Sequence, residues 1–129
     1  MRALIPLLAA ALLTACSPSV QKSEVAGMYV LEGKVEFFLD IQSNGTYVHT
    51  KIEKDGTKIV RTGRWEWDGT DSDNPMCLDG FQVFPGEGIG VSDTPSFFIL
   101  HPEHSAQGVR FPVGDPDTPS HYFIRQTQE

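Results

Sequence analysis

The chain has 129 residues, a mass of 14.2 kDa and a formal net charge of −7. This length accommodates one small domain and excludes a multi-domain enzyme. Hydrophobic residues make up 40% of the sequence and charged residues 21%, which is typical of a folded domain and not of a disordered tail. The excess of acidic residues argues against nucleic acid as a partner.

The N-terminus has the pattern of a secretory signal peptide. Arg2 precedes an apolar run over residues 3–13, which is too short to span the roughly 30 Å hydrocarbon core of a membrane. The run ends in Leu13-Thr14-Ala15-Cys16, and this ending resembles the cleavage site of bacterial lipoproteins. The resemblance implies cleavage before Cys16, a diacylglycerol on its sulfur and a further acyl chain on its amine, which together give a firm membrane anchor. An ordinary secreted protein, in which Cys16 is incidental, is the alternative.

The residues after Cys16 indicate a destination and a tether. Ser17 stands where an aspartate would resemble the inner-membrane retention signal of enterobacteria, so we expect the outer membrane, with the domain facing the periplasm. Residues 17–24 are polar and lack periodicity, which is typical of a linker. The expected organisation is therefore a signal peptide (residues 1–15), a lipidated cysteine with its tether (16–24) and a single domain (25–129).

Charge and cysteine content limit what the mature domain can use. Residues 66–129 carry eleven acidic residues and two arginines, so part of the surface is expected to be anionic, which suits solubility, a cation or a basic protein partner. If Cys16 carries lipid, Cys77 has no second cysteine with which to form a disulfide. Cys77 shares strand parity with Phe81 and Val83, which predicts a small buried hydrophobe; an exposed thiol that pairs with another chain is the alternative.

The mature chain has the pattern of an antiparallel β protein. Glycine and proline recur about every ten residues, and no stretch has a helical apolar stripe. Apolar side chains alternate with polar ones from Val35 to Ile41, and Asn44-Gly45 and Asp55-Gly56 predict tight hairpin turns. The expected strands cover residues 25–31, 35–41, 46–54, 57–67, 76–84, 96–100, 108–113 and 121–126.

About eight strands joined by short connections leave no room for crossover helices. We therefore expect an all-β domain, either a small antiparallel up-and-down barrel or a curved sandwich, because closing the sheet protects its edges. Gly27-Met28-Tyr29 in the first strand and Arg125 in the last resemble the Gly-x-Trp and arginine of small lipocalin-like (calycin) lipoproteins. The resemblance implies that Arg125 packs across the ring of Tyr29. Such a cation–π contact is stabilising in itself, so a purely structural role stays open.

The fourth expected strand suggests a ligand cup. Arg61, Gly63, Trp65 and Trp67 have the same parity, so their side chains share one face. A barrel of about eight strands either fills with side chains or holds one small ligand. An inward Arg61 requires an anion, a carboxylate or a barrel mouth, unless a bulge at Gly63 turns it outward. The expected ligand-binding residues are Trp65, Trp67, Arg61, Tyr29 and Arg125, with Phe37, Phe81, Phe97 and Phe123 lining the same cup; a filled aromatic core is the alternative.

Two polar clusters contain residue types that bind metals. His101-Pro102-Glu103-His104, completed by His49 or His121, has ligands for zinc or copper, but Pro102 prevents a helix and favours a solvated loop. The second cluster offers oxygen ligands for calcium, although its order departs from an EF-hand loop; it comprises Asp68, Asp71, Asp73, Asn74 and Asp79. We therefore expect no metal and no cofactor.

Catalytic motifs are not found in the sequence. The glycine-rich run from Gly86 to Gly90 is neither a phosphate-binding loop nor a nucleophile elbow, so we do not expect an enzyme.

Three functions remain. The first is a lipid-anchored module that binds a small apolar or amphipathic ligand, which predicts a cavity beside Trp65 and Trp67. The second is an envelope interaction protein with a filled barrel and an exposed apolar or acidic patch. Within this class, Ser43-Asn-Gly-Thr-Tyr47 is similar to the Ser-Gly-x-x-Tyr motif of periplasmic lysozyme inhibitors, which implies a basic lysozyme as partner. The third is metal handling through His101 and His104.

Overall fold

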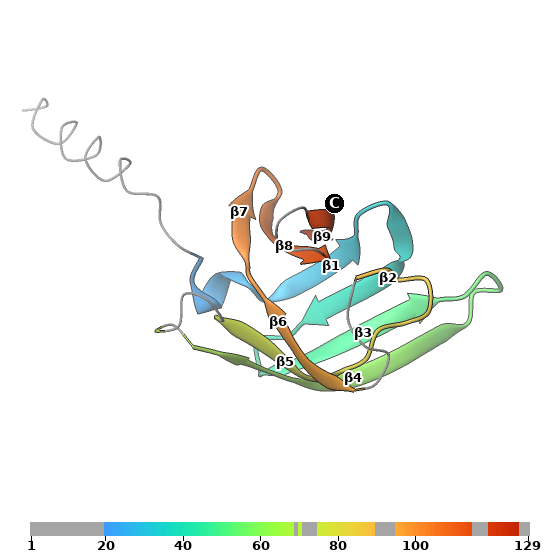
Figure 1. Cartoon of the computed structure of the whole chain (residues 1–129), viewed down its shortest axis with the longest axis horizontal. Coiled ribbons are helices and arrows are strands. Elements are labelled where there is room, and N and C mark those ends of the chain that lie inside the picture. Colours follow the sequence, from blue (N-terminus) through green and yellow to red (C-terminus); the bar gives the residue numbers. More distant parts are fainter. Residues whose placement is uncertain (1–19, 69, 71–74, 90–94, 115–118, 127–129) are drawn as a thin grey trace, which may run out of the picture.

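The computed structural model describes residues 20–68, 70, 75–89, 95–114 and 119–126. These residues form one nine-stranded antiparallel sheet that curls strongly into a half-barrel (Figure 1). A 3-10 turn, η1, precedes the sheet at Lys22–Glu24, within the segment expected to be tether. The strands are β1 (Gly27–Leu31), β2 (Lys34–Ile41), β3 (Thr46–Ile52), β4 (Lys58–Trp67), β5 (Met76–Phe81), β6 (Ser96–Leu100), β7 (Glu103–Ser105), β8 (Gly108–Gly114) and β9 (Pro119–Arg125). The predicted all-β antiparallel class is confirmed.

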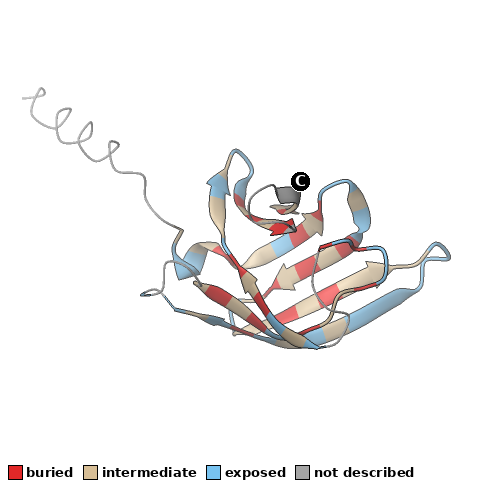
Figure 2. Cartoon of the chain, viewed as in Figure 1, coloured by how far each residue is buried: buried red, intermediate tan, exposed pale blue. Residues whose placement is uncertain are grey.

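The strand order explains how the sheet curls. Strands lie in the order β6-β5-β4-β3-β2-β1-β9-β8-β7, so the first and last strands, β1 and β9, pair inside the sheet, and β6 and β7 form the two edges. The right-handed twist of strands coils a sheet of this width, and here it brings β6 into contact with β8. The core lies inside this curl, where most buried residues are found (Figure 2). Among the described residues, no helix has the length and apolarity needed to traverse a membrane.

Both predicted hairpin turns are present. Gly45, between β2 and β3, has φ +92°, and the Asn44 side chain accepts a hydrogen bond from the Thr46 amide at 3.1 Å. Gly56, between β3 and β4, has φ +89°, and the Asp55 side chain accepts from the Thr57 amide at 2.9 Å. This hydrogen bond lowers the pKa of Asp55 from its usual value. Positive φ angles favour glycine, which is why these dipeptides fix the ends of the strands.

The alternation predicted for the fifth strand is wrong. The pairing of β5 with β6 shifts between Leu78 and Phe81, where Gly80 has φ +70°. Such a bulge reverses the face on which later residues lie. Leu78 and Phe81 therefore both point into the core, whereas Cys77 lies on the opposite face and is half-buried.

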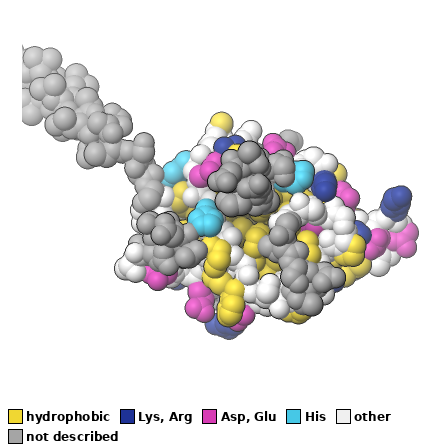
Figure 3. Space-filling view, viewed as in Figure 1, with side chains coloured by type: hydrophobic (Ala, Val, Ile, Leu, Met, Phe, Trp, Pro, Cys, Tyr) yellow, Lys and Arg dark blue, Asp and Glu magenta, His cyan; other side chains and the backbone are white. Residues whose placement is uncertain are grey.

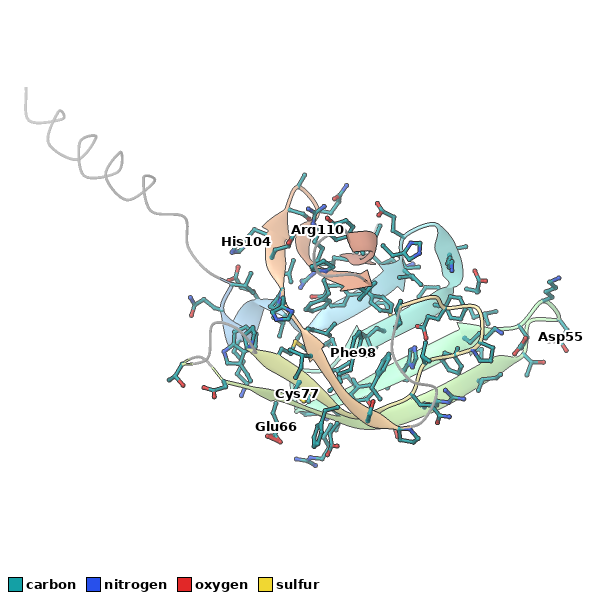
Figure 4. All side chains as sticks on the ribbon, in the orientation of Figure 1. Asp55, Glu66, Cys77, Phe98, His104 and Arg110 are labelled. Atoms are coloured by element: carbon teal, nitrogen blue, oxygen red, sulfur yellow. The ribbon has the colours of Figure 1, made fainter. Side chains whose placement is uncertain are left out.

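The same register overturns the expectation for Phe97. Its neighbour Phe98 pairs with Leu78 and points into the curl, as Figure 4 shows. Phe97 consequently faces outward with 70% of its surface exposed, so it does not line a cup.

Two further expectations about the second half of the chain are corrected. The segment expected to be a solvated loop around His104 instead forms β7, which pairs with β8 and is reinforced by a 2.6 Å hydrogen bond from Arg110 to Glu103. The fifth strand ends at Phe81 and not at Phe84, because residues 82–89 leave the sheet and cross its inner face.

Candidate ligand site

Aromatic and aliphatic side chains fill the deep part of the half-barrel. Trp65 and Trp67 share a face, as predicted: Trp65 is buried and its Nε1 donates to the Gln42 carbonyl at 2.8 Å, while Trp67 packs against the edge of the core. The hollow beside them is a notch of about 370 Å³ that includes Lys22, Asn44 and Glu66 in its lining. These tryptophans are therefore core residues, and the hollow that they line within the described part of the chain is a mainly polar notch.

Arg125 and Tyr29 meet as expected, in a structural contact. The guanidinium carbon of Arg125 lies 5.2 Å from the centroid of the Tyr29 ring, and Nη2 donates to the Tyr29 hydroxyl at 2.7 Å and to the Glu24 carbonyl. The Tyr29 hydroxyl in turn donates to the Val25 carbonyl at 2.6 Å. Burial raises the pKa of Tyr29 although Arg125 opposes this shift. The contact ties the first strand to the last.

Gly27 allows this contact. A Cβ at Gly27 would lie 3.3 Å from the guanidinium carbon of Arg125, closer than ordinary van der Waals contact. The match to the Gly-x-Trp and arginine pattern therefore corresponds to a packing requirement between β1 and β9.

An apolar groove lies on the same inner face, beyond the filled core. Phe37 pairs with Lys51 and Lys51 with Ile59, and paired residues of antiparallel strands share a face. Phe37 is buried, whereas Ile59 is 38% exposed and Val35, two residues before Phe37, is 73% exposed. Around them is an open groove of about 980 Å³, at the end of the sheet that carries the β3–β4 hairpin; it is lined by Val35, Glu36, Lys51, Ile52, Glu53, Lys54, Asp55, Thr57 and Ile59.

The groove has an apolar floor and a charged rim. In Figure 3, acidic and basic side chains gather at the projecting β3–β4 hairpin, whose tip carries Asp55 in Figure 4. The Lys51 ammonium lies 5.8 Å from the centroid of the Phe37 ring and 3.8 Å from a Glu53 oxygen. Such a surface fits a molecule that has an apolar body and a polar end.

Residues 82–89, which we call the plug, are attached to the inner face of the sheet by side chains of β2 and β4. The Lys34 ammonium on β2 donates to the carbonyls of Gly86 at 2.9 Å and Glu87 at 3.3 Å. Arg61 on β4 donates to two further plug carbonyls, Gln82 at 3.0 Å and Val83 at 3.3 Å. In Figure 1 the plug crosses β2 and β3 on the inner side of the curl. Basic side chains of the barrel wall thus hold the plug by its backbone.

A buried acid–imidazole pair completes the attachment. Glu87 in the plug and His49 on β3 are both fully buried, and Glu87 Oε2 lies 2.7 Å from His49 Nε2. Glu87 Oε1 accepts a 2.9 Å hydrogen bond from the Phe84 amide. His49 Nδ1 has no hydrogen-bond partner among the described residues.

Aromatic rings enclose this pair. The His49 ring lies with its centroid 4.4 Å from those of both Phe81 and Phe84, and the Arg61 guanidinium stacks over Phe84 at 4.2 Å. The predicted inward orientation of Arg61 is confirmed. Its partners, however, are plug carbonyls and an aromatic face instead of an anion.

Gly63 does not form the bulge that was considered, because the β3–β4 register is continuous. A Cβ at Gly63 would lie 2.5 Å from the ring of Tyr47, so glycine leaves space for that ring. Tyr47 is buried and its hydroxyl donates to the Asp79 carbonyl at 2.8 Å. Burial, with Asp79 and Cys77 nearby, raises the pKa of Tyr47 to about 12. Tyr47 therefore has a packing role, although it belongs to the motif similar to that of lysozyme inhibitors.

The histidines considered for metal binding are not gathered. His49 is paired with Glu87, while His104 Nδ1 approaches Glu24 only to 4.0 Å, and no group of three or more His, Cys, Asp or Glu that could hold a metal occurs in the part of the chain that the structure describes. Figure 4 shows His104 on β7, distant from Asp55 at the tip of the β3–β4 hairpin. Burial, with Asp79 and Glu66 nearby, raises the pKa of the Cys77 thiol and disfavours its reactive thiolate. Cys16, Asp71, Asp73 and Asn74 lie outside the described residues.

Sequence reasoning missed Glu87 and His49 as a pair. The available signal was the flanking of Glu87 by Gly86 and Gly88, which have φ +87° and +70°. One glycine with positive φ on each side of Glu87 lets the backbone turn sharply, and this turn directs the Glu87 side chain inward. No known family model matches the chain, and neither a curated protein nor a solved structure matches it.

Proposed function

We propose that this chain is a non-enzymatic protein of the cell envelope, anchored through lipid on Cys16 to the outer membrane and facing the periplasm. It binds a small apolar or amphipathic molecule on the inner face of its half-barrel. The observation that supports this role best is the groove at Val35 and Ile59, where apolar side chains on the inner face stay exposed. The groove volume of about 980 Å³ is in the range of small-molecule sites.

A second candidate is a protein-interaction module. The deep core is filled, and Phe97 on the edge strand β6 is exposed over 70% of its surface. Exposed aromatic residues are enriched in protein interfaces, and the acidic second half of the chain would suit a basic partner. The groove favours the first candidate because it combines a concave shape with an apolar floor.

Titration with the uncharged fluorescent dye Nile red tests the ligand site. Ile59→Lys places a charge in the groove, whereas Val60→Lys places the same charge on the outer face of the same strand, where Val60 is 54% exposed. We expect saturable binding that Ile59→Lys weakens by about tenfold and Val60→Lys by less than about twofold, since a tenfold change corresponds to about 1.4 kcal/mol. Equal effects of the two variants, or no saturable binding, would contradict the proposal.

A further inference from the structure

We propose that His49 is the receptor for the acidic head group of an amphipathic carboxylate, and that Glu87 of the plug holds this position until the ligand displaces it. This inference rests on the proposed ligand-binding function and names the chemical class of the ligand. The ligand has a carboxylate at one end and an apolar tail that lies in the groove at Val35 and Ile59.

The barrel wall presents three basic side chains to the plug from three adjacent strands. Lys34 lies on β2, His49 on β3 and Arg61 on β4, and each makes a hydrogen bond to the plug. The plug offers them one carboxylate and four backbone carbonyls. Lys34 and Arg61 thus bring two positive charges, against one negative charge from Glu87. The wall is electrostatically suited to an anion.

Head site and groove are close enough for one small molecule. His49 and Lys51 are two residues apart on β3 and on the same face, which corresponds to about 7 Å along a strand. Lys51 lines the groove, and the Phe37 ring, 5.8 Å from the Lys51 ammonium, also lies 4.0 Å from a Cβ built at Gly86. Displacing Glu87 would free His49 on the face that carries the groove, and the tail of the ligand would reach the groove past Phe37.

The plug is not part of the sheet, and it is attached to the wall in the way that a bound ligand would be. It contributes no strand, and side-chain hydrogen bonds attach it to the wall. Replacing a buried ionic pair by apolar residues is often neutral for stability, so filling the core does not require a carboxylate and an imidazole here. Gly86 and Gly88 adopt positive φ on both sides of Glu87, a backbone that directs a carboxylate at His49.

The test compares a dansyl-labelled undecanoic acid with its uncharged methyl ester. Both probes have the same tail, so the ratio of their dissociation constants isolates recognition of the carboxylate. They are titrated by fluorescence into the full chain carrying Cys16→Ser, which leaves every described residue unchanged. Glu87→Gln removes the competing charge but keeps hydrogen-bonding atoms. Glu66→Gln, at an exposed position on the outer side of β4 (Figure 4), removes one negative charge elsewhere.

The inference predicts that the acid binds about tenfold more tightly than the ester, and that Glu87→Gln tightens the acid by a further factor of about ten while Glu66→Gln does not. Adding His49→Phe to Glu87→Gln should remove the preference for the acid and leave the ester unaffected. If that double variant does not fold, the comparison of Glu87→Gln with the parent chain decides: no gain in acid affinity overturns the inference. If acid and ester bind equally to the parent chain and to every variant, recognition of the carboxylate by His49 is overturned, whereas the proposed ligand site in the groove is not. Binding of neither probe to any variant overturns the proposed function as well.

Discussion

Glu87 is fully buried although carboxylates are mostly exposed in proteins. Its two oxygens take hydrogen bonds from His49 and from the Phe84 amide. Burying a charge is unfavourable unless such partners replace water. This residue is therefore the point at which the plug depends most on a single side chain.

Glu87→Ala should lower the free energy of unfolding by about 1–3 kcal/mol, because it leaves the His49 Nε2 group and the Phe84 amide buried without their partner. Urea unfolding followed by far-ultraviolet circular dichroism measures this change. Glu66→Ala, which truncates an exposed glutamate, is the control and should stay within about 0.5 kcal/mol of the parent. Equal effects of the two variants would show that the pair contributes nothing to stability.

Gly63→Ala tests the packing of Tyr47 against β4. The added methyl group would lie 2.5 Å from a buried ring whose hydroxyl is hydrogen-bonded to the Asp79 carbonyl, so the ring cannot move without losing that bond. We expect a loss of about 1–3 kcal/mol in thermal or urea unfolding, as is usual for overpacked sites. Thr62→Ala changes the exposed neighbour on the same strand and should have little effect. A Gly63→Ala variant as stable as the parent would contradict the geometry.

At the scale of elements, the plug and the hairpins differ in how far the sequence predicts them. The β2–β3 and β3–β4 hairpins depend on local turn chemistry. Asn44-Gly45 and Asp55-Gly56 favour the positive φ angles of tight turns, so these hairpins can be predicted from the sequence alone. The path of residues 82–89 depends instead on contacts with strands about forty residues earlier in the chain, such as that between His49 and Glu87. Local patterns do not encode such pairs.

The bulge in β5 explains why the prediction for Cys77 is wrong. Strict alternation assigns Cys77 to the face of Phe81, and the single register shift at Gly80 reverses that assignment. A glycine inside a strand often indicates a bulge, but Gly63 also lies inside a strand and forms no bulge. Sequence therefore located most strands and the facing of Arg61, Trp65 and Trp67, whereas the plug and the acid–imidazole pair required the tertiary structure.

Gly86→Ala tests whether the plug gates the inner face. Alanine at φ +87° is strained by about 1–2 kcal/mol, and this strain should favour release of the plug. Gly45→Ala carries the same strain at φ +92° in the β2–β3 turn, away from the plug, and is the matched control. Both variants should lose similar stability, but only Gly86→Ala should bind the dansyl-labelled acid more tightly, by about tenfold. Equal affinities in the two variants would argue against gating.

For the whole molecule, the contacts of η1 determine where the folded domain begins. The described domain begins at Val20, and η1 leads directly into β1, whose partner β9 is tied to η1 through the contact of Arg125 with Glu24. If Cys16 carries lipid, as we propose, only a few residues separate the lipid from η1, and the ligand site would lie close to the membrane.

The anchor itself is tested by Cys16→Ser. If Cys16 carries the lipid, its replacement should move the protein from the membrane fraction to the soluble fraction of lysed cells, since the apolar anchor is lost. Immunoblots of the two fractions measure the shift, and Cys77→Ser is the control that keeps Cys16. Unchanged membrane retention of Cys16→Ser would contradict the lipid assignment.

Native mass spectrometry tests the central claim most directly. The protein is isolated from the cell envelope without chelator, and its native mass is compared with its denatured mass, both for the parent chain and for Ile59→Lys. The account predicts additional mass on the parent chain that leaves on denaturation, that is reduced in Ile59→Lys, and that corresponds to a small amphipathic carboxylic acid. A native mass equal to the denatured mass in protein taken directly from the envelope would contradict the account and would favour the interaction module.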